Sequence, residues 1–199
     1  VFDRMPSLGR KFLMAGRGGL NLTHAEPLDY FLKRYEPVSP VLGTAIRAFP
    51  PEALRQWAHD LGQETFVGTS GRVFPQAMKA SPLLRAWLGK LNTLGVSFHL
   101  RHEFLGWNDA GALRFATPDG EITRTFDATV LALGGASWPR LGADGSWAEW
   151  LGTPVAPLRA TNAGVFTDWS AILREKHVGS ALKRISIRIG DRVERGEAI

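Results

Sequence analysis

The spacing of apolar and polar residues predicts helices in the first half of the chain. Apolar positions recur every three to four residues over about 27–35, 40–48 and 51–61, as they do on the buried face of a helix. Residues 64–75 follow a different pattern, with a glycine-rich turn at 68–71, and this predicts a small β-hairpin.

A longer helix is expected between Ser81 and Gly95. Ser81 suits the N-cap position and Pro82 the first helical turn. The residues that would face the core follow at helical spacing: Leu84, Trp87, Leu88, Leu91 and Leu94. Gly95 suits the residue just after the helix, where a left-handed backbone is common.

The second half of the chain favours strands. Val96, Phe98 and Leu100 alternate with polar residues, which predicts a strand. Three more strands are expected after it, separated by turn sequences at 108–111 and 118–120. Strands joined by such short turns form an antiparallel meander.

Two segments are expected to be parallel strands covered on both faces. Residues 1–3 look like the end of one, because apolar residues give way to an acid. The apolar run 128–133, which ends in Gly134-Gly135, looks like another. In a dinucleotide-binding fold a glycine-rich phosphate loop precedes such an acid by about 20 residues, so that loop is expected upstream of Val1.

The pattern changes again after the glycine pair. A short helix is expected at about 145–151. From Pro154 the chain consists of short β-like pieces, notably 185–189, so we expect a domain boundary near Pro157. No internal repeat and no low-complexity segment is found.

The composition is that of a globular protein, since 199 residues with 44% hydrophobic content can bury the core of one domain or slightly more. The net charge of +5 comes from basic residues scattered among acids, which does not favour nucleic acid as a partner. Cysteine is absent, so redox chemistry must come from a bound cofactor. We find no apolar run of about 18 residues and no secretion signal, and we expect a cytoplasmic protein without a membrane partner.

Three groups of residues suit contacts to a nucleotide cofactor. Asp3, at the end of its strand, suits hydrogen bonds to the two ribose hydroxyls of an adenosine. An ordinary surface aspartate at a strand end explains this residue equally well. The loop 16–23 carries three glycines in its first four positions, followed by Asn21 and Thr23, so its backbone can approach a ligand; an ordinary turn is the alternative. The glycine pair at the end of the later apolar run has the same two interpretations.

Other catalytic classes find less support. Ser70 and Ser137 each have a glycine two positions before them but none two positions after them, so the Gly-x-Ser-x-Gly pattern of a nucleophile elbow is incomplete and a serine hydrolase is not indicated. The five histidines show no spacing suited to a metal site. His99 and His102 are expected on opposite faces of a strand.

Three sequence blocks, at 2–11, 14–24 and 130–139, together carry a family resemblance. They read FDRMPSLGRK, MAGRGGLNLTH and VLALGGASWP, and the expected meander lies between the last two. The chain resembles the BaiN-like (YhiN-like) bacterial flavoproteins, which are described as NAD(P)/FAD-dependent oxidoreductases. The resemblance extends over essentially the whole chain. Many relatives have a cysteine where this chain has Leu20, so no thiol assistance is expected.

The resemblance implies an α/β fold in which residues 1–157 form a two-dinucleotide-fold FAD-binding domain. This domain would combine a mostly parallel sheet with the three-stranded antiparallel meander, and 158–199 would begin an inserted β-rich domain. The strand-end acid, the Gly-Arg-Lys turn, the glycine-rich loop, the main chain near residue 104 and the glycine pair would all lie along FAD. The cofactor-binding candidates are thus Asp3, Arg4, Gly9, Arg10, Lys11, Gly16, Gly18, Gly19, Asn21, Thr23, Phe104, Gly134 and Gly135.

We therefore expect an FAD-dependent oxidoreductase of a small-molecule substrate, in which flavin carries the hydride and NAD(P)H is the candidate electron donor. No residue stands out as a catalytic acid or base, and no metal is expected. Two alternatives remain open. A protein that binds NAD(P) without flavin would share Asp3 but would leave the meander and the loop 16–23 unexplained, and a noncatalytic binding module would have the same sequence and no flavin.

Overall fold

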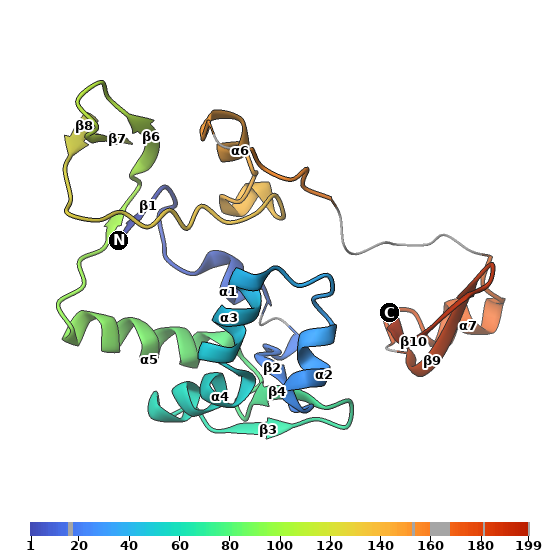
Figure 1. Ribbon diagram of the computed structural model, residues 1–199. Coiled ribbons are helices and arrows are strands. Elements are labelled where there is room, and N and C mark those ends of the chain that lie inside the picture. The colour runs from blue at the N-terminus through green and yellow to red at the C-terminus, as the bar shows by residue number, and fades with distance from the viewer. Residues whose placement is uncertain (16–17, 153, 160–167, 181, 199) are drawn as a thin grey trace. The chain divides into compact units, whose positions relative to one another are not determined.

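The computed structural model describes residues 1–15, 18–152, 154–159, 168–180 and 182–198. The chain divides into two compact units, Val1–Leu158 and Arg159–Ile199. The first contains helices, a parallel strand pair and two small antiparallel sheets, and the second contains a helix and a β-hairpin (Figure 1).

A parallel strand pair begins the first unit. The sequence predicts residues 1–3 as a parallel strand but does not predict its partner. β1 (Phe2–Asp3) pairs with β5 (His99–Leu100) in parallel register. The pairing continues beyond the strands, because the His102 amide donates a hydrogen bond to the Asp3 carbonyl oxygen at 3.0 Å. Asp3 therefore lies at the carboxyl end of a parallel strand, the edge at which open α/β sheets bind ligands.

The two histidines near β5 depart from their expected arrangement on opposite faces. Arg101, between them, has a left-handed φ of 56°, which interrupts the alternation of a strand. Both rings consequently lie near Phe2, with centroid distances of 4.5 Å for His99 and 5.6 Å for His102. The expectation of opposite faces is wrong, and both side chains belong to one aromatic cluster.

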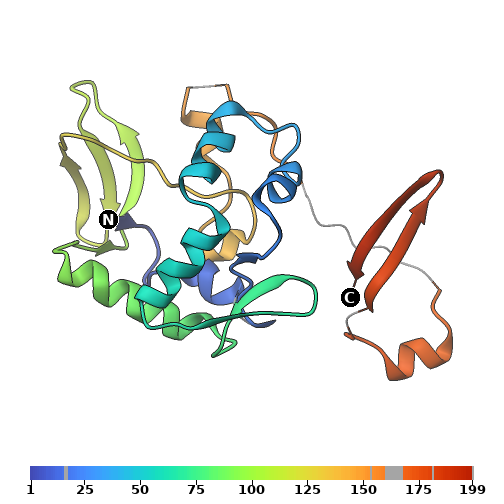
Figure 2. The same ribbon diagram turned by 60° about the horizontal axis from the view of Figure 1, so that its bottom comes forward.

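The antiparallel meander is confirmed. β6 (Glu103–Trp107), β7 (Leu113–Thr117) and β8 (Gly120–Arg124) form a three-stranded sheet in this order. Leu113 and Phe115 of the central strand are buried. Both views show this sheet beside the N-terminal strand (Figures 1 and 2).

The three helices expected in the first half are present as α2 (Leu28–Lys33), α3 (Pro40–Ala48) and α4 (Pro51–Asp60). Ser39 caps α3, since its hydroxyl oxygen accepts a hydrogen bond from the Leu42 amide at 3.2 Å. Proline occupies the first position of both α3 and α4, where its missing N–H costs no helical hydrogen bond.

The expected hairpin is part of a second antiparallel sheet. β3 (Thr65–Val67) and β4 (Arg72–Pro75) form the hairpin, and β2 (Thr23–His24) adds to the other side of β4. β2 was not predicted, because two residues following a glycine-rich loop give no visible alternation.

The long helix α5 (Ala80–Thr93) begins one residue before Ser81, so the prediction that Ser81 caps it is wrong. Lys79 takes the cap position in an extended conformation, and Ala80 is buried. Gly95 follows the helix with a φ of 77°, as predicted.

A short helix that was not predicted, α1 (Arg10–Ala15), begins directly after Gly9 and includes the last two residues of the turn expected there, Arg10 and Lys11. One buried cluster lies between the segment after α1, α4 and α5. Its buried members are Leu20, Ala58, Ala80 and Leu83, and Phe12, Leu22, Trp57 and Leu61 pack against it.

The apolar run 128–133 is not a strand, contrary to prediction. Val130 is 90% exposed and Leu131 is also exposed, so the run is covered on neither face. The N–H and C=O groups of a strand form hydrogen bonds with the C=O and N–H groups of a neighbouring strand. Among the described residues, no strand pairs with this segment. The run leads instead into η2 (Pro139–Leu141) and the expected short helix α6 (Trp147–Trp150).

The second unit consists of α7 (Ala171–Lys176) and a hairpin of β9 (Leu182–Ile189) and β10 (Arg192–Ala198). The hairpin turns at Gly190, whose φ is 59°. Ser170 caps α7 through a hydrogen bond from the Leu173 amide to its hydroxyl oxygen.

Candidate cofactor site and adjoining pocket

Asp3 is held in a turn at the end of β1. Its carboxylate oxygen Oδ1 accepts a hydrogen bond from the Met5 amide at 2.8 Å. Phe104 lies on β6, two residues beyond His102, whose amide bonds to the Asp3 carbonyl. The structure therefore brings the Asp3 carboxylate and the main chain near Phe104 to the same end of the parallel strand pair.

Arg4 connects this turn to a loop far away in the sequence. Its Nη2 donates to the Asp144 carboxylate at 2.7 Å and to the Gly142 carbonyl at 2.8 Å, and its Nη1 lies 3.5 Å from the Glu103 carboxylate. The Arg4 guanidinium, helped by hydrogen bonds from Ser146, holds the pKa of Asp144 well below its usual range, and Asp144 raises the pKa of Arg4. The loop after the glycine pair is thus attached to the end of β1.

A second contact joins the same loop to α1. Lys11 Nζ donates to the Ser137 hydroxyl at 3.1 Å, and the Trp147 indole N–H donates to the Gly134 carbonyl at 2.9 Å. Both views show the loop beside α1 (Figures 1 and 2). Arg10 is the first residue of α1, next to Lys11. Candidate residues from the first and last sequence blocks therefore lie together.

The residues of the glycine-rich loop differ in how closely their neighbours approach the main chain. Gly16 lies outside the described residues. A Cβ atom at Gly18 or Gly135 would meet nothing within 4 Å, so the main chain is open at both positions. Gly19 has a φ of 98°, and a Cβ there would lie 2.4 Å from the Met78 side chain. Leu20 enters the core cluster that Phe12 of α1 also contacts.

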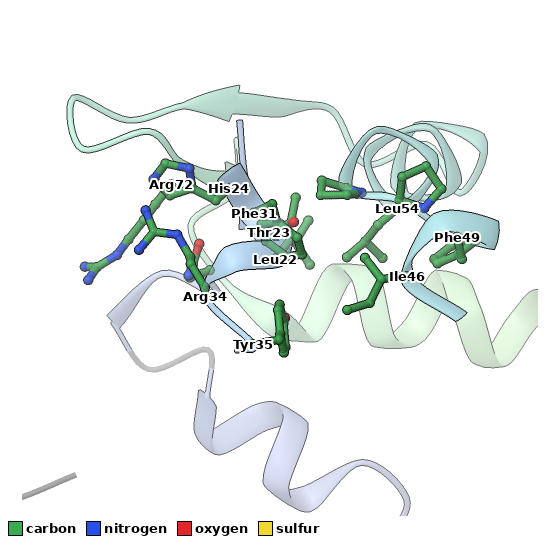
Figure 3. A pocket seen from close by; sticks show the side chains of 13 residues that line it. Leu22, Thr23, His24, Phe31, Arg34, Tyr35, Ile46, Phe49, Leu54 and Arg72 are labelled. Atoms are coloured by element: carbon green, nitrogen blue, oxygen red, sulfur yellow. The ribbon is translucent and has the colours of Figure 1, made fainter. Parts of the chain in front are cut away.

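Asn21 and Thr23, the polar candidates of the loop, line a cavity of about 470 Å³. Its other walls come from β4 and from α2, α3 and α4 with the segments that join them. In Figure 3 the side chains of Arg34, Arg72 and His24 gather at one end of this cavity, and those of Ile46, Leu54 and Phe49 at the other. The sequence did not predict this cavity, because its walls come from five elements.

The basic end of the cavity contains an ion pair. Arg34 donates from Nε and Nη2 to the two carboxylate oxygens of Glu26, the latter bond being 2.9 Å long. This pairing lowers the pKa of Glu26 and raises the pKa of Arg34. The Glu26 carboxylate therefore stays ionised at neutral pH and fixes the Arg34 side chain.

The chain matches a family model described as the HI0933-like protein Rossmann domain over residues 1–169. The chain belongs to this family. The family is related to the BaiN/YhiN flavoprotein oxidoreductases, so the resemblance of the three sequence blocks is confirmed, as is the α/β fold that combines parallel and antiparallel strands. No curated protein matches the chain.

In this HI0933-like Rossmann domain, the matched residues include every candidate cofactor residue and the whole cavity. β9 and β10 lie beyond them. The described part of the chain has no group of three or more His, Asp or Glu side chains that could hold a metal. None of the helices that the structure describes is long and apolar enough to cross a membrane.

Proposed function

We propose that this HI0933-like Rossmann domain binds FAD and serves an oxidoreductase that acts on a small-molecule substrate. The observation that carries the proposal is the position of Asp3 at the carboxyl end of β1, beside the main chain of β6, in a chain of this family. A carboxylate at that edge suits the ribose hydroxyls of a dinucleotide.

The residues present fit the cofactor. Asp3 uses Oδ1 for the Met5 amide, and its second oxygen Oδ2 is not part of that bond. Lys11 and Arg10 supply positive charge next to the loop that follows Gly134-Gly135, which suits a pyrophosphate. The open main chain at Gly18 and Gly135 allows close approach of a ligand.

FAD, when bound, supplies the hydride transfer that no side chain of this cysteine-free chain can perform. In this proposal the protein binds and orients the cofactor through the thirteen candidate residues named from the sequence. NAD(P)H is the proposed electron donor. We propose 1–157 as the FAD-binding domain and 158–199 as the beginning of a β-rich domain.

The proposal is tested by titrating the chain with FAD and following the quenching of flavin fluorescence. Asp3→Asn keeps an oxygen for the Met5 amide and removes the charge and one strong acceptor, so FAD should bind about 10- to 100-fold more weakly. Asp119→Asn, in the exposed turn before β8, is the matched control and should bind FAD as the parent chain does. Lys11→Gln should weaken binding, while Lys90→Gln, exposed on α5, should not.

Equal FAD affinities for Asp3→Asn and Asp119→Asn would contradict the proposed ribose contact. Binding of NADH or NADPH in the absence of any FAD binding would favour a nicotinamide-binding protein instead. Where FAD binds, anaerobic mixing with NADH and with NADPH, followed by the loss of oxidised-flavin absorbance, identifies the electron donor.

A further inference from the structure

The loop that follows the glycine pair contacts the turn that carries Asp3. Gly142 has a φ of 94°, and a Cβ there would lie 2.9 Å from Cγ and 3.0 Å from Sδ of Met5. Because glycine has no Cβ, the Met5 side chain packs directly against the main chain at Gly142. The Met5 amide in turn donates to Oδ1 of Asp3 at 2.8 Å. The loop therefore contacts the residue whose amide holds the Asp3 carboxylate.

Asp144 joins the loop to the same turn by charge. Its Oδ2 accepts a hydrogen bond from Nη2 of Arg4 at 2.7 Å, and Arg4 stands between Asp3 and Met5 in the chain. Its Oδ1 accepts two hydrogen bonds from Ser146, one from the amide at 3.1 Å and one from the hydroxyl at 2.9 Å. Both carboxylate oxygens thus have partners within the protein, which fixes the orientation of this side chain.

Both Nη nitrogens of Arg4 are engaged by the protein. Nη2 also donates to the Gly142 carbonyl at 2.8 Å, and Nη1 lies 3.5 Å from a Glu103 carboxylate oxygen. A guanidinium that faces two carboxylates has its charge compensated, which makes it a weak ligand for a pyrophosphate. Arg4 therefore suits a link between the loop and the turn better than a direct contact to FAD.

The loop is closed on itself between its ends. The Trp147 indole N–H donates to the Gly134 carbonyl at 2.9 Å. A Cβ at Gly145, whose φ is 75°, would lie 2.9 Å from the Ala136 Cβ, so the two sides of the loop are in contact. Compact loops whose ends meet behave as packed units. The attachment of the loop to the Arg4 turn therefore fixes the glycine pair as well.

From these contacts we propose that Asp144 and Gly142 are positioning residues of the cofactor site. They hold the turn at Arg4 and Met5, and through the Met5 amide they keep the Asp3 carboxylate in the orientation that binds the ribose of FAD. Neither residue contacts FAD. A carboxylate that is already oriented loses less conformational entropy on binding, so FAD binds more tightly. The role in FAD binding rests on the proposed function, whereas the hold on the Asp3 carboxylate does not.

The first test follows the quenching of FAD fluorescence by the 199-residue chain. Asp144→Asn keeps the size of the side chain and removes its charge. It should weaken FAD binding about three- to fivefold, which is the effect of losing a partly exposed ion pair. Glu121→Gln is the matched control, because it breaks the bidentate Arg114–Glu121 pair of the meander, with bonds of 2.6 and 3.0 Å. It should leave the FAD affinity within about twofold of the parent value.

A double-variant cycle separates this link from a direct contact between Arg4 and FAD. Arg4→Gln should also weaken FAD binding. Arg4→Gln combined with Asp144→Asn should bind FAD as Arg4→Gln alone does, because the same contact is lost only once. The proposal is overturned if Asp144→Asn binds FAD as Glu121→Gln does, or if the losses of the two single variants multiply in the double variant.

The second test needs no cofactor. Hydrogen exchange of the Met5 amide, measured by NMR, reports its bond to Asp3. Exchange should be at least about threefold faster in Asp144→Asn than in the parent chain, while the amides of β7 in the meander keep their rates. Gly142→Ala should have the same effect, and Gly111→Ala, at a φ of 77° with nothing within 4 Å of its Cβ, should not. An unchanged Met5 rate in Asp144→Asn, or equal acceleration at Met5 and in β7, would overturn the proposal.

The two tests also distinguish this proposal from the proposed function. If the parent chain does not bind FAD, the proposed function and the role of Asp144 in FAD binding both fail, and a faster Met5 exchange in Asp144→Asn still supports the hold on Asp3. If the chain binds FAD and Asp144→Asn changes neither the FAD affinity nor the Met5 exchange, the proposed function stands and the positioning role is wrong.

Discussion

Arg4 and Asp144, 140 positions apart in the sequence, are joined by a 2.7 Å hydrogen bond between Nη2 and Oδ2. The same Arg4 nitrogen also donates to the Gly142 carbonyl. The loop that follows the glycine pair is therefore attached to the turn that carries Asp3, through one guanidinium. This contact joins two of the three candidate cofactor-binding segments.

The Arg4–Asp144 contact should respond to acid. Because Arg4 lowers the pKa of Asp144 in the folded chain below its ordinary value of 3.8, the contact is present above that value and is lost as the pH falls through the lower, folded-state value. An NMR titration of the Asp144 carboxyl carbon should therefore show a midpoint well below 3.8. In Arg4→Gln the midpoint should move up toward the ordinary value. The same midpoint in both proteins would show that Arg4 does not hold this carboxylate in solution.

Gly9→Ala should destabilise the first unit by about 2–4 kcal/mol, as the sum of two effects. Gly9 has a φ of 67°, and a Cβ there would lie 2.7 Å from the Leu84 side chain. Gly95, with a φ of 77°, has nothing within 4 Å of its hypothetical Cβ, so Gly95→Ala should carry only the backbone cost of about 1–2 kcal/mol. Urea unfolding of both variants separates steric overlap from backbone strain. Equal losses would mean that the Leu84 side chain moves aside freely.

Local patterns were sufficient to predict the elements that satisfy their own hydrogen bonds. The helices α2, α3 and α4 and the meander appear where apolar spacing and turn residues place them. The parallel strand at Asp3 was also predicted, because a strand that ends in an acid is a local feature. The predicted start of α5 was slightly too late, because Lys79 in an extended conformation takes the N-cap position that the sequence assigned to Ser81.

Features that depend on distant partners were not predicted. The run 128–133 has the composition of a buried strand, yet it lies exposed in the part of the chain that the structure describes, because composition does not supply a pairing partner. The cavity at Asn21 has basic side chains from Arg34, directly after α2, and from Arg72 of β4, and α3 and α4 lie between them in the sequence. The arginines and aromatic residues were visible, but nothing local indicated that they meet.

Leu83→Ala should cost about 2–5 kcal/mol of unfolding free energy, since Leu83 is fully buried and belongs to the cluster of Leu20, Ala58 and Ala80. Removing its isobutyl group leaves a cavity that the surrounding helices can only partly close. Leu94→Ala is the matched control at the end of the same helix, where the side chain is 65% exposed, and it should change stability by less than about 0.5 kcal/mol. A shift of the urea midpoint with an unchanged slope of unfolding free energy against urea concentration would confirm that the substitution changes stability alone. Equal effects of the two substitutions would place Leu83 outside the cooperative core.

Gly71→Ala should displace the His24 ring. Gly71 has a φ of 82°, and a Cβ there would lie 2.5 Å from the imidazole Cε1, so the ring must leave its place against the Ser70 carbonyl. The substitution should therefore destabilise the first unit by about 2–4 kcal/mol, from the backbone strain together with the steric overlap. Gly62→Ala is the matched control, because Gly62 has a φ of 72° and an open Cβ position, so it should cost only the backbone strain of about 1–2 kcal/mol. Urea unfolding of both variants measures the difference. If both variants lose the same stability, the His24 ring moves aside freely and its contact with the Ser70 carbonyl does not contribute to the fold.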